Sequence, residues 1–279
     1  MVRSKYKIKI SWIVAIILAV TYFLISIIPF IYMILNSFKG KFEILVNGVF
    51  SIPTKFDISN FITVLNGGFF HYLLNSILVL VVTLIFLLFF TACASYPLSR
   101  FKFKFSGTIY VIIIACMSIP VHITLIPIFK MTNVIGLYDT IWSLIGPYIA
   151  FGVPISVFIL TSFMKGLPKE MEEAAEIDGC NKYKTFFNII LPLSTPGLST
   201  LAIYNGVNIW NEFIFAYTLT QSAPNRTLPL AIWEYQGQYA MNIPMIMAVL
   251  SLTILPMVIL FIFFQDKLVK GITAGAIKG

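Results

Sequence analysis

Long apolar runs separated by short polar stretches are the main pattern of this 279-residue chain. A helix needs about 20 consecutive apolar residues to cross the hydrocarbon core of a bilayer. Six segments reach that length, at about 11–35, 72–98, 106–129, 139–163, 198–220 and 244–264. Several contain Pro, Gly or Asn, which membrane helices tolerate where neighbouring helices or a water-lined cavity satisfy the freed backbone groups. The pattern predicts an all-α polytopic membrane protein, a packed bundle of six transmembrane helices forming one domain over 1–279.

Composition excludes a water-soluble globular protein. Hydrophobic residues make up 59% of the chain, charged residues 11%, and the mean hydropathy is +0.93. The chain has three cysteines, Cys93, Cys116 and Cys180, and two of them fall in apolar runs. We therefore expect them to behave as small buried hydrophobic residues and to form no disulfide framework. The basic N-terminus leads into an apolar run without a small-residue cleavage site, which favours an uncleaved first span.

The basic residues indicate an orientation. With the N-terminus inside, only five of the 19 Lys and Arg residues fall in outer segments, namely Lys39, Lys41, Lys55, Lys130 and Arg226. The positive-inside rule therefore predicts a multi-pass protein with both termini cytoplasmic, together with the 164–197 loop and the 265–279 tail. The net charge of +8 is thus a topology signal, and we expect membrane lipid but no nucleic acid as a partner.

The 164–197 loop is unusually acidic for so apolar a chain. Residues 172–193 read EEAAEIDGCNKYKTFFNIILPL. Pro168 and the acids that follow are typical of a helix start, and Gly179 suits a helix C-terminus. A second helix is expected from about Asn181 to Ile190, with Tyr183, Phe186, Phe187 and Ile190 on one side. The loop therefore predicts two short helices joined at a glycine.

Two interpretations of this helix pair compete. It could be an amphipathic anchor in the membrane interface, which composition alone favours. An anionic inner leaflet would, however, repel its acids, and Ala174, Ala175 and Gly179 would let another protein surface approach closely. We therefore favour a docking knob for a partner protein.

The loop carries Glu173-Ala174-Ala175, then Gly179 after three residues, Ile189 after nine more and Leu191-Pro192 after one more. This spacing resembles the EAA signature of bacterial ABC importer permeases. In that family the loop is a coupling helix that inserts into a cleft of the ATPase subunit. The resemblance implies the importer-permease helical bundle and bacterial plasma-membrane localisation. It also implies ATPase-coupling roles for Glu172, Glu173, Ala174, Ala175, Asp178, Gly179, Leu191 and Pro192.

Other segments are similar to one permease subunit of maltose-transporter-type carbohydrate importers. They are SIPTKFDISNF (51–61), LLNS (73–76), PLSRFKFKFSG (97–107), IPVHITLIPIF (119–129), GLYDT (136–140), WNEF (210–213), APNRTLPLAIWEYQGQ (223–238) and the C-terminal KGITAGAIKG. The resemblance implies a heterodimer with a second permease, an ATPase dimer and an extracellular solute-binding protein. It implies that the tail contacts the ATPase through Gly275, Lys278 and Gly279. It also implies that the binding protein touches Arg226, Trp233 and Tyr235, although an aromatic membrane belt would explain these aromatics too.

No phosphate-binding loop of the G-x-x-x-x-G-K-[ST] type occurs, so ATP and Mg²⁺ are expected on the partner ATPase and no cofactor on this chain.

Candidate pathway residues are polar groups inside spans. Asn205, Asn208 and Glu212 would share a helix face, with Asn211 beside it. Glu212 could equally lie near outer water or bond a neighbouring helix. His122 is a weaker candidate, because packing or a bond at a helix break would explain it.

Two other classes of function compete with this prediction. An intramembrane enzyme needs a nucleophile with a base, or a metal cluster, and His71 and His122 are the only histidines, so no catalytic or metal-binding residue is predicted. A secondary transporter would need inverted repeats or intramembrane charge runs. An ABC permease for a non-sugar solute stays an alternative. The sequence thus predicts the permease subunit of an ATP-driven sugar or oligosaccharide importer.

Overall fold

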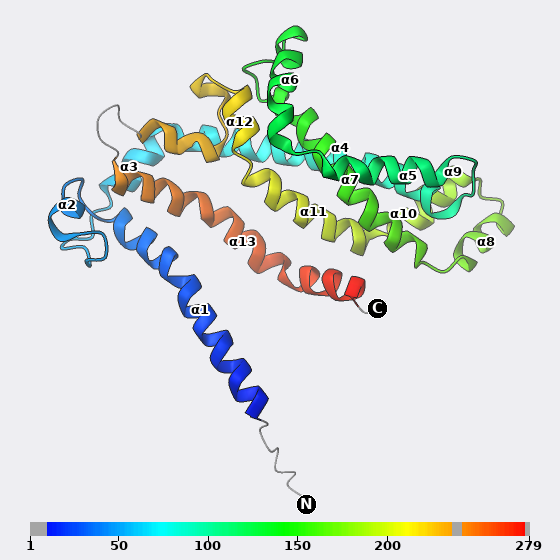
Figure 1. Ribbon diagram of the computed structural model, residues 1–279, viewed down its shortest axis with the longest axis horizontal. Coiled ribbons are helices and arrows are strands. Elements are labelled where there is room, and N and C mark those ends of the chain that lie inside the picture. The colour runs from blue at the N-terminus through cyan, green and yellow to red at the C-terminus, as the bar shows by residue number, and fades with distance from the viewer. Residues whose placement is uncertain (1–9, 236–241, 277–279) are drawn as a thin grey trace, which may run out of the picture. The chain divides into compact units, whose positions relative to one another are not determined.

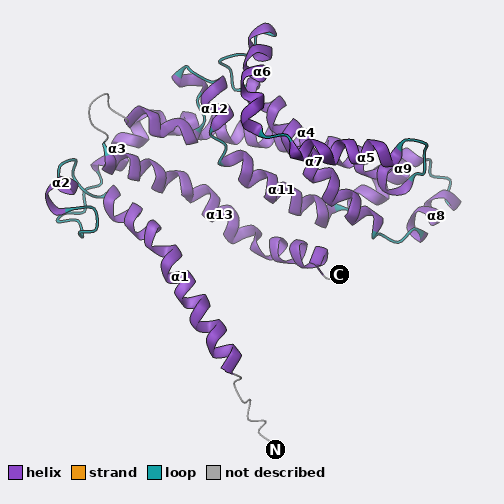
Figure 2. Ribbon diagram, in the orientation of Figure 1, coloured by secondary structure: helices purple, strands orange, loops and turns teal. Residues whose placement is uncertain are grey.

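The computed structural model describes residues 10–235 and 242–276, in which helices are joined by turns and loops and no strand occurs (Figure 2). The all-α prediction is confirmed. Contacts group the chain into two units, one of Met1–Gly68 with Ile232–Ile254 and one of Phe69–Ala231 with Leu255–Gly279. The expectation of one domain over 1–279 stays a prediction.

The first unit holds α1 (Ile10–Ser37), α2 (Glu43–Asn47), α3 (Ser59–Val64) and the beginning of α13 (Ile243–Ala276). Beyond α1 the chain folds around the buried side chain of Lys39, whose Nζ donates to the carbonyls of Gly48 and Val49 at 3.1 and 3.3 Å. Asn60 Nδ2 donates to the carbonyls of Ser37 and Lys39, each at 2.9 Å. Burial lowers the pKa of Lys39, because it disfavours the charged amine.

The second unit is built on two long helices, α4, Phe70–Arg100, and α7, Trp142–Lys165, which lie side by side (Figure 1). Its other elements are shorter, apart from the end of α13. They are α5 (Ser106–Ala115), η2 (Cys116–Ser118), α6 (Val121–Val134), α8 (Glu170–Ile177), α9 (Lys182–Thr185), η3 (Phe186–Ile190), α10 (Leu191–Leu193), α11 (Thr195–Trp210), α12 (Ile214–Leu219) and η4 (Ala223–Asn225). Two further elements, η1, Leu65–Phe69, and η5, Leu228–Tyr235, run across the unit boundaries.

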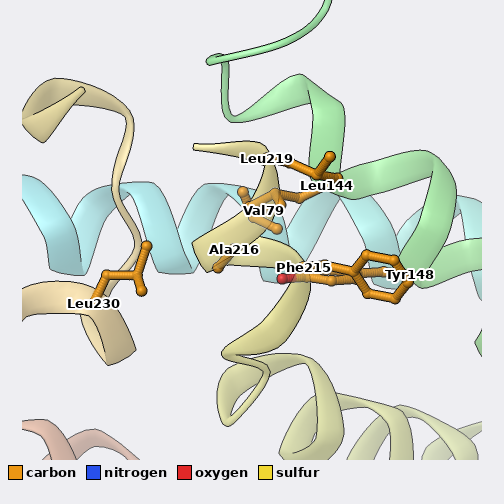
Figure 3. Packing of buried hydrophobic residues seen from close by; sticks show 7 residues of the cluster. All are labelled: Val79, Leu144, Tyr148, Phe215, Ala216, Leu219 and Leu230. Carbon is orange, nitrogen blue, oxygen red and sulfur yellow. The ribbon is translucent and has the colours of Figure 1, made fainter. Parts of the chain in front are cut away.

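Two apolar clusters fill the second unit. The first joins Val79 of α4, Leu144 and Tyr148 of α7, Phe215, Ala216 and Leu219 of α12, and Leu230 (Figure 3). The second joins Ala92 and Tyr96 of α4, Leu160 and Met164 of α7, Phe186 and Ile190 of η3, and Leu201 of α11. Each cluster takes residues from both α4 and α7, so these two helices form the frame on which the shorter elements pack.

Between the clusters, α4, α7 and α11 meet at Gly152. A Cβ on Gly152 would overlap Leu87 Cδ1 and lie 3.0 Å from Asn205 Oδ1. Asn205 Nδ2 donates to Ser156 Oγ at 2.9 Å, and Ser156 Oγ donates to the Gly152 carbonyl at 2.7 Å. Small residues allow this close helix contact inside a membrane, and the polar groups bond across it.

Four helical stretches within the described residues are long and apolar enough to cross a membrane, or up to six if each of two bent pairs is one span. The four are Trp12–Ser37, Ser59–Arg100, Trp142–Lys165 and Ile243–Phe263. The predicted span 106–129 is bent by 98° between Ser118 and Val121. Pro120 explains the break, because proline forces the residue before it into an extended conformation.

Replacing Gly152 with Val should destabilise the protein by about 1–3 kcal/mol, because the fully buried Leu87 has no free space to move into. Gly146→Val is the matched control in the same helix, since a Cβ there meets nothing within 4 Å. Unfolding of the detergent-solubilised variants would measure the difference. Equal stability of the two variants would contradict the close packing at Gly152.

Candidate coupling site

Helix α8 begins and ends as its sequence dictates. Three acidic residues occupy its first turn, where their negative charges interact favourably with the positive end of the helix dipole and stabilise the helix. At the other end Gly179 is left-handed, with φ of 76°. Its N–H donates to the Glu176 carbonyl at 3.0 Å, and the Cys180 N–H donates to the Ala175 carbonyl at 2.9 Å. These two bonds form a Schellman cap, which confirms the predicted helix and the position of Gly179 at its C-terminus.

The second helix of the loop starts as expected and then widens. Asn181 caps α9, its Oδ1 accepting the Lys184 N–H at 2.9 Å. From Phe186 to Ile190 the chain forms a π-helix, η3, in place of the predicted continuous helix, and α10 follows it directly.

The expected common side of this helix is only partly buried. Phe186 and Ile190 are buried, whereas Tyr183 is 78% and Phe187 48% exposed. The four positions are spaced i, i+3, i+4 and i+7, so they share one helical face, and the Phe186 and Phe187 ring centroids lie 4.8 Å apart. The core covers only the part of this face that Phe186 and Ile190 occupy.

Phe186 and Ile190 anchor the loop in the second apolar cluster. The Phe186 ring stacks on Tyr96 of α4 with centroids 5.0 Å apart and an interplanar angle of 30°. Ile190 is fully buried in the same cluster, and Leu191 packs against it. The end of the loop is thus fixed to α4, α7 and α11 together.

An ion pair holds the start of the loop. Arg100 Nε, at the end of α4, lies 2.5 Å from Glu172 Oε1, and the two side chains are 3% and 14% exposed. Arg100 Nη2 also donates to the Leu167 carbonyl at 3.0 Å. Breaking a buried pair by removing one partner costs about 3–5 kcal/mol, because the other charge stays buried. Sequence reasoning missed this role of Arg100, since a basic residue at the end of a span is ordinary and nothing distinguishes it from Lys102.

The predicted coupling residues therefore form two sets. Glu173, Ala174, Asp178, Gly179 and Pro192 are exposed, whereas Ala175 is 3% exposed and Glu172 and Leu191 are partly buried. Ile177 is 86% exposed and Tyr183 78% exposed in the same segment. We call the exposed residues of 170–185 the knob.

The predicted tail residues lie only partly within the structure. Helix α13 continues past the predicted span end at 264 to Ala276, so Gly275 lies inside a helix. Lys278 and Gly279 are outside the described residues.

The candidate pathway residues are not brought to one face. Asn205 is 4% exposed and bonds Ser156, as described above. Asn208 and Asn211 are exposed, and their Nδ2 atoms donate to the carbonyls four residues earlier at 2.9 and 2.8 Å. His122 is exposed in the first turn of α6. Their place in a pathway stays a prediction.

Glu212 lies beyond α11, which ends at Trp210, so the expectation that it continues the helix face of Asn205 is wrong. Its carboxylate accepts the N–H groups of Phe215 and Ala216 at 2.9 and 3.2 Å and the Tyr148 hydroxyl at 2.6 Å. It thus caps α12 and ties it to α7. This is the helix-bonding alternative that the sequence had left open.

At the far end of α4 from Arg100, the 221–230 segment folds over Asp139. Asp139 Oδ1 accepts the N–H groups of Gln221 and Ser222, each at 2.8 Å, and the Ser222 hydroxyl donates to Oδ2. Although partial burial raises the pKa of Asp139, the hydrogen bonds from Ser222 and Gln221 outweigh it and bring the pKa below the ordinary 3.8. Asp139 therefore holds this segment as an ionised carboxylate.

Asn75 and Ser76 hold the same segment on α4. Asn75 Nδ2 donates to the carbonyls of Pro224 and Arg226 at 2.8 and 2.9 Å, and Ser76 Oγ accepts the Leu228 N–H at 2.8 Å. The Arg226 guanidinium donates to the Gln221 carbonyl at 3.2 and 3.0 Å. The other candidates for binding-protein contact are Trp233, 41% exposed, and Tyr235, whose backbone lies in η5.

The architecture is a membrane bundle with a protruding loop that carries the EAA spacing. Residues 89–274 match the family model described as "Binding-protein-dependent transport system inner membrane component". This chain belongs to that family. It is a multi-pass inner-membrane permease of an ABC transporter, a transport subunit that works with a separate ATPase and a solute-binding protein.

Curated relatives agree with this membership. The permease is 50% identical to a putative ABC transporter permease of Caldicellulosiruptor sp. (strain Rt8B.4), over 92% of this chain and 93% of the relative. It is 34% identical to an arabinooligosaccharides transport system permease of Halalkalibacterium halodurans, over 97% of each. It is 35% identical to a trehalose/maltose transport system permease of Thermococcus litoralis, over 92% and 93%.

A solved structure shares the fold. One chain of a bacterial ABC transporter involved in the import of the acidic polysaccharide alginate superposes with a TM-score of 0.79, covering 95% of this permease and 99% of that chain, at 21% identity.

Phe186→Ala should destabilise the detergent-solubilised permease by about 3–5 kcal/mol, because it removes a buried ring and its stack on Tyr96. Phe187→Ala, one residue along and half exposed, is the matched control and should cost less than about 1 kcal/mol. Unfolding measurements on both would compare them. A larger loss for Phe187→Ala would show that the anchor is misplaced.

Asp139→Asn should loosen the 221–226 segment, because the amide cannot offer two charged acceptor oxygens. Faster amide hydrogen exchange of Gln221 and Ser222 would show it, with Asp57→Asn, in the other unit, as the control. Since the pKa of Asp139 is lowered, its contribution is present above pH 3.8 and is lost as the pH falls further. Protection that weakened already between pH 7 and 5 would contradict this.

Proposed function

We propose that this permease translocates a sugar or oligosaccharide that an external binding protein delivers, and that the knob docks on the partner ATPase. The observation that carries the docking is the knob itself, an exposed acidic and apolar protrusion on a buried root. Ile177 and Tyr183, 86% and 78% exposed among the acids of the loop that carries the EAA spacing, support a surface that a partner covers. The names of the arabinooligosaccharide and trehalose/maltose relatives support sugars as the solute class.

Energy would enter through the knob. ATP and Mg²⁺ are held by the ATPase dimer, and its closure would push on Glu173, Ala174, Asp178 and Gly179. Because Phe186, Ile190 and Leu191 are packed into the core, the push would move α4, α7 and α11 as a body. Gly275, Lys278 and Gly279 would add ATPase contacts from the tail.

The remaining partners follow from the same proposal. Both termini lie in the cytoplasm together with the knob. The 221–230 segment, which includes Arg226, faces the binding protein, and Trp233 and Tyr235 further along the chain also contact that protein. A second permease completes a heterodimer. Exposed Asn208 and Asn211 support this, because side-chain amides are costly against lipid and would be hydrated along a path between two permeases. Asn205, Glu212 and His122 would line or support that path.

A mild-detergent pull-down of tagged permease from its native membrane tests the assembly. Recovery of a second permease with a P-loop ATPase is expected, whereas a stoichiometric lone monomer would contradict it. Proteoliposomes of the complex, given binding protein, should then take up labelled maltose, trehalose or arabino-oligosaccharides in an ATP-dependent way. Uptake of amino acids alone would contradict the sugar assignment.

Ile177→Ser should reduce recovery of the ATPase about tenfold, which corresponds to about 1.4 kcal/mol and to the truncation of an apolar anchor of the docking surface. Phe103→Ser is the control, since Phe103 is 42% exposed between α4 and α5, outside the knob. Quantitative copurification measures both. Unchanged recovery with Ile177→Ser would remove the knob from the ATPase interface.

A further inference from the structure

We propose that Arg100 is the positioning residue that ties α8 to α4, so that a push on the knob reaches the membrane helices. This inference rests on the proposed function and assigns a residue outside the EAA spacing to its coupling step. The Arg100–Glu172 ion pair therefore acts as a latch between the ATPase-facing helix and the longest helix of the second unit.

The latch is needed because α8 has little packing of its own. Ala175 is its one buried residue, and most of its other side chains are exposed. The two residues that anchor the loop in the second apolar cluster, Phe186 and Ile190, lie further along the chain, beyond the turn at Gly179 and Asn181. Without a second attachment, α8 could pivot about that turn and absorb the movement of the ATPase.

Arg100 supplies that attachment at two points. Its Nε meets Glu172 in the first turn of α8, and its Nη2 donates to the carbonyl of Leu167 in the link between α7 and α8. The contact with Glu172 is a charge pair, since neither Nε nor Oε1 makes a hydrogen bond within the described residues, whereas Nη2 makes a hydrogen bond to Leu167. One guanidinium thus holds a charge partner and a carbonyl through two different nitrogens, which the single ammonium of a lysine cannot reproduce. The 3% and 14% exposures keep water from weakening the pair.

The position of Arg100 makes the latch effective. It is the last residue of α4, one turn from Tyr96, whose ring stacks on Phe186. Both halves of the loop therefore reach the same end of α4, the first through an ion pair and the second through an aromatic stack. The latch turns the loop into a two-point grip on one helix.

The test uses the complete importer in proteoliposomes and measures ATP hydrolysed per sugar taken up. Arg100→Gln and Glu172→Gln should each raise this ratio about tenfold, and the double variant should raise it no further, because all three remove the same interaction. Arg100→Lys should lie between Arg100→Gln and the wild type. Lys102→Gln removes an exposed charge two residues away and should keep the wild-type ratio.

Each outcome decides one point. ATPase recovery should stay at the wild-type level in all variants, so that a raised ratio reports coupling and not lost assembly. A wild-type ratio in Arg100→Gln, or a double variant near a hundredfold, would overturn the latch, because the two residues would then be dispensable or independent. Loss of ATPase recovery in both Arg100→Lys and Glu172→Gln would also overturn it. A wild-type complex without ATP-dependent sugar uptake would contradict the proposed function itself.

Discussion

The close contact of α4 with α7 is the constraint on which the second unit depends. At Gly152 the two helices approach so nearly that a Cβ atom there would overlap Leu87 Cδ1, and Asn205 of α11 bonds Ser156 one turn further along α7. Lipid tails are as apolar as a leucine side chain, so burial alone does not hold membrane helices together. Close packing and polar bonds supply the attraction here, and both apolar clusters form on either side of this crossing.

Helix α4 reaches both functional ends of that unit. A helix of 31 residues is about 46 Å long, enough to span a bilayer with some excess. One end carries Arg100 and Tyr96, which hold the loop with the EAA spacing. The other carries Asn75 and Ser76, which hold the 221–230 segment. A rigid helix with bonded partners at both ends is suited to passing a displacement from one to the other.

The polar groups of the helices mostly stabilise the bundle. Glu212 was the strongest ionisable candidate for a pathway, yet it caps α12 and accepts a bond from Tyr148. Asn205 likewise bonds α7. Because an unbonded polar group in lipid is so costly, a polar residue in a span meets the nearest available partner, and its type alone does not separate structural from transport roles.

The sequence by itself determined the class, most helices and the family, because span length, basic-residue asymmetry and the EAA spacing are properties of neighbouring residues. It also predicted α8 and its cap at Gly179, which depend on local backbone preferences. Only the tertiary structure decided that Phe186 and Ile190 are buried while Tyr183 and Phe187 are not, that α11 ends before Glu212, and that Arg100 meets Glu172. The contacts join residues far apart in the sequence, 72 positions for Arg100 and Glu172 and 90 for Tyr96 and Phe186, and no periodicity or composition records which of them will meet.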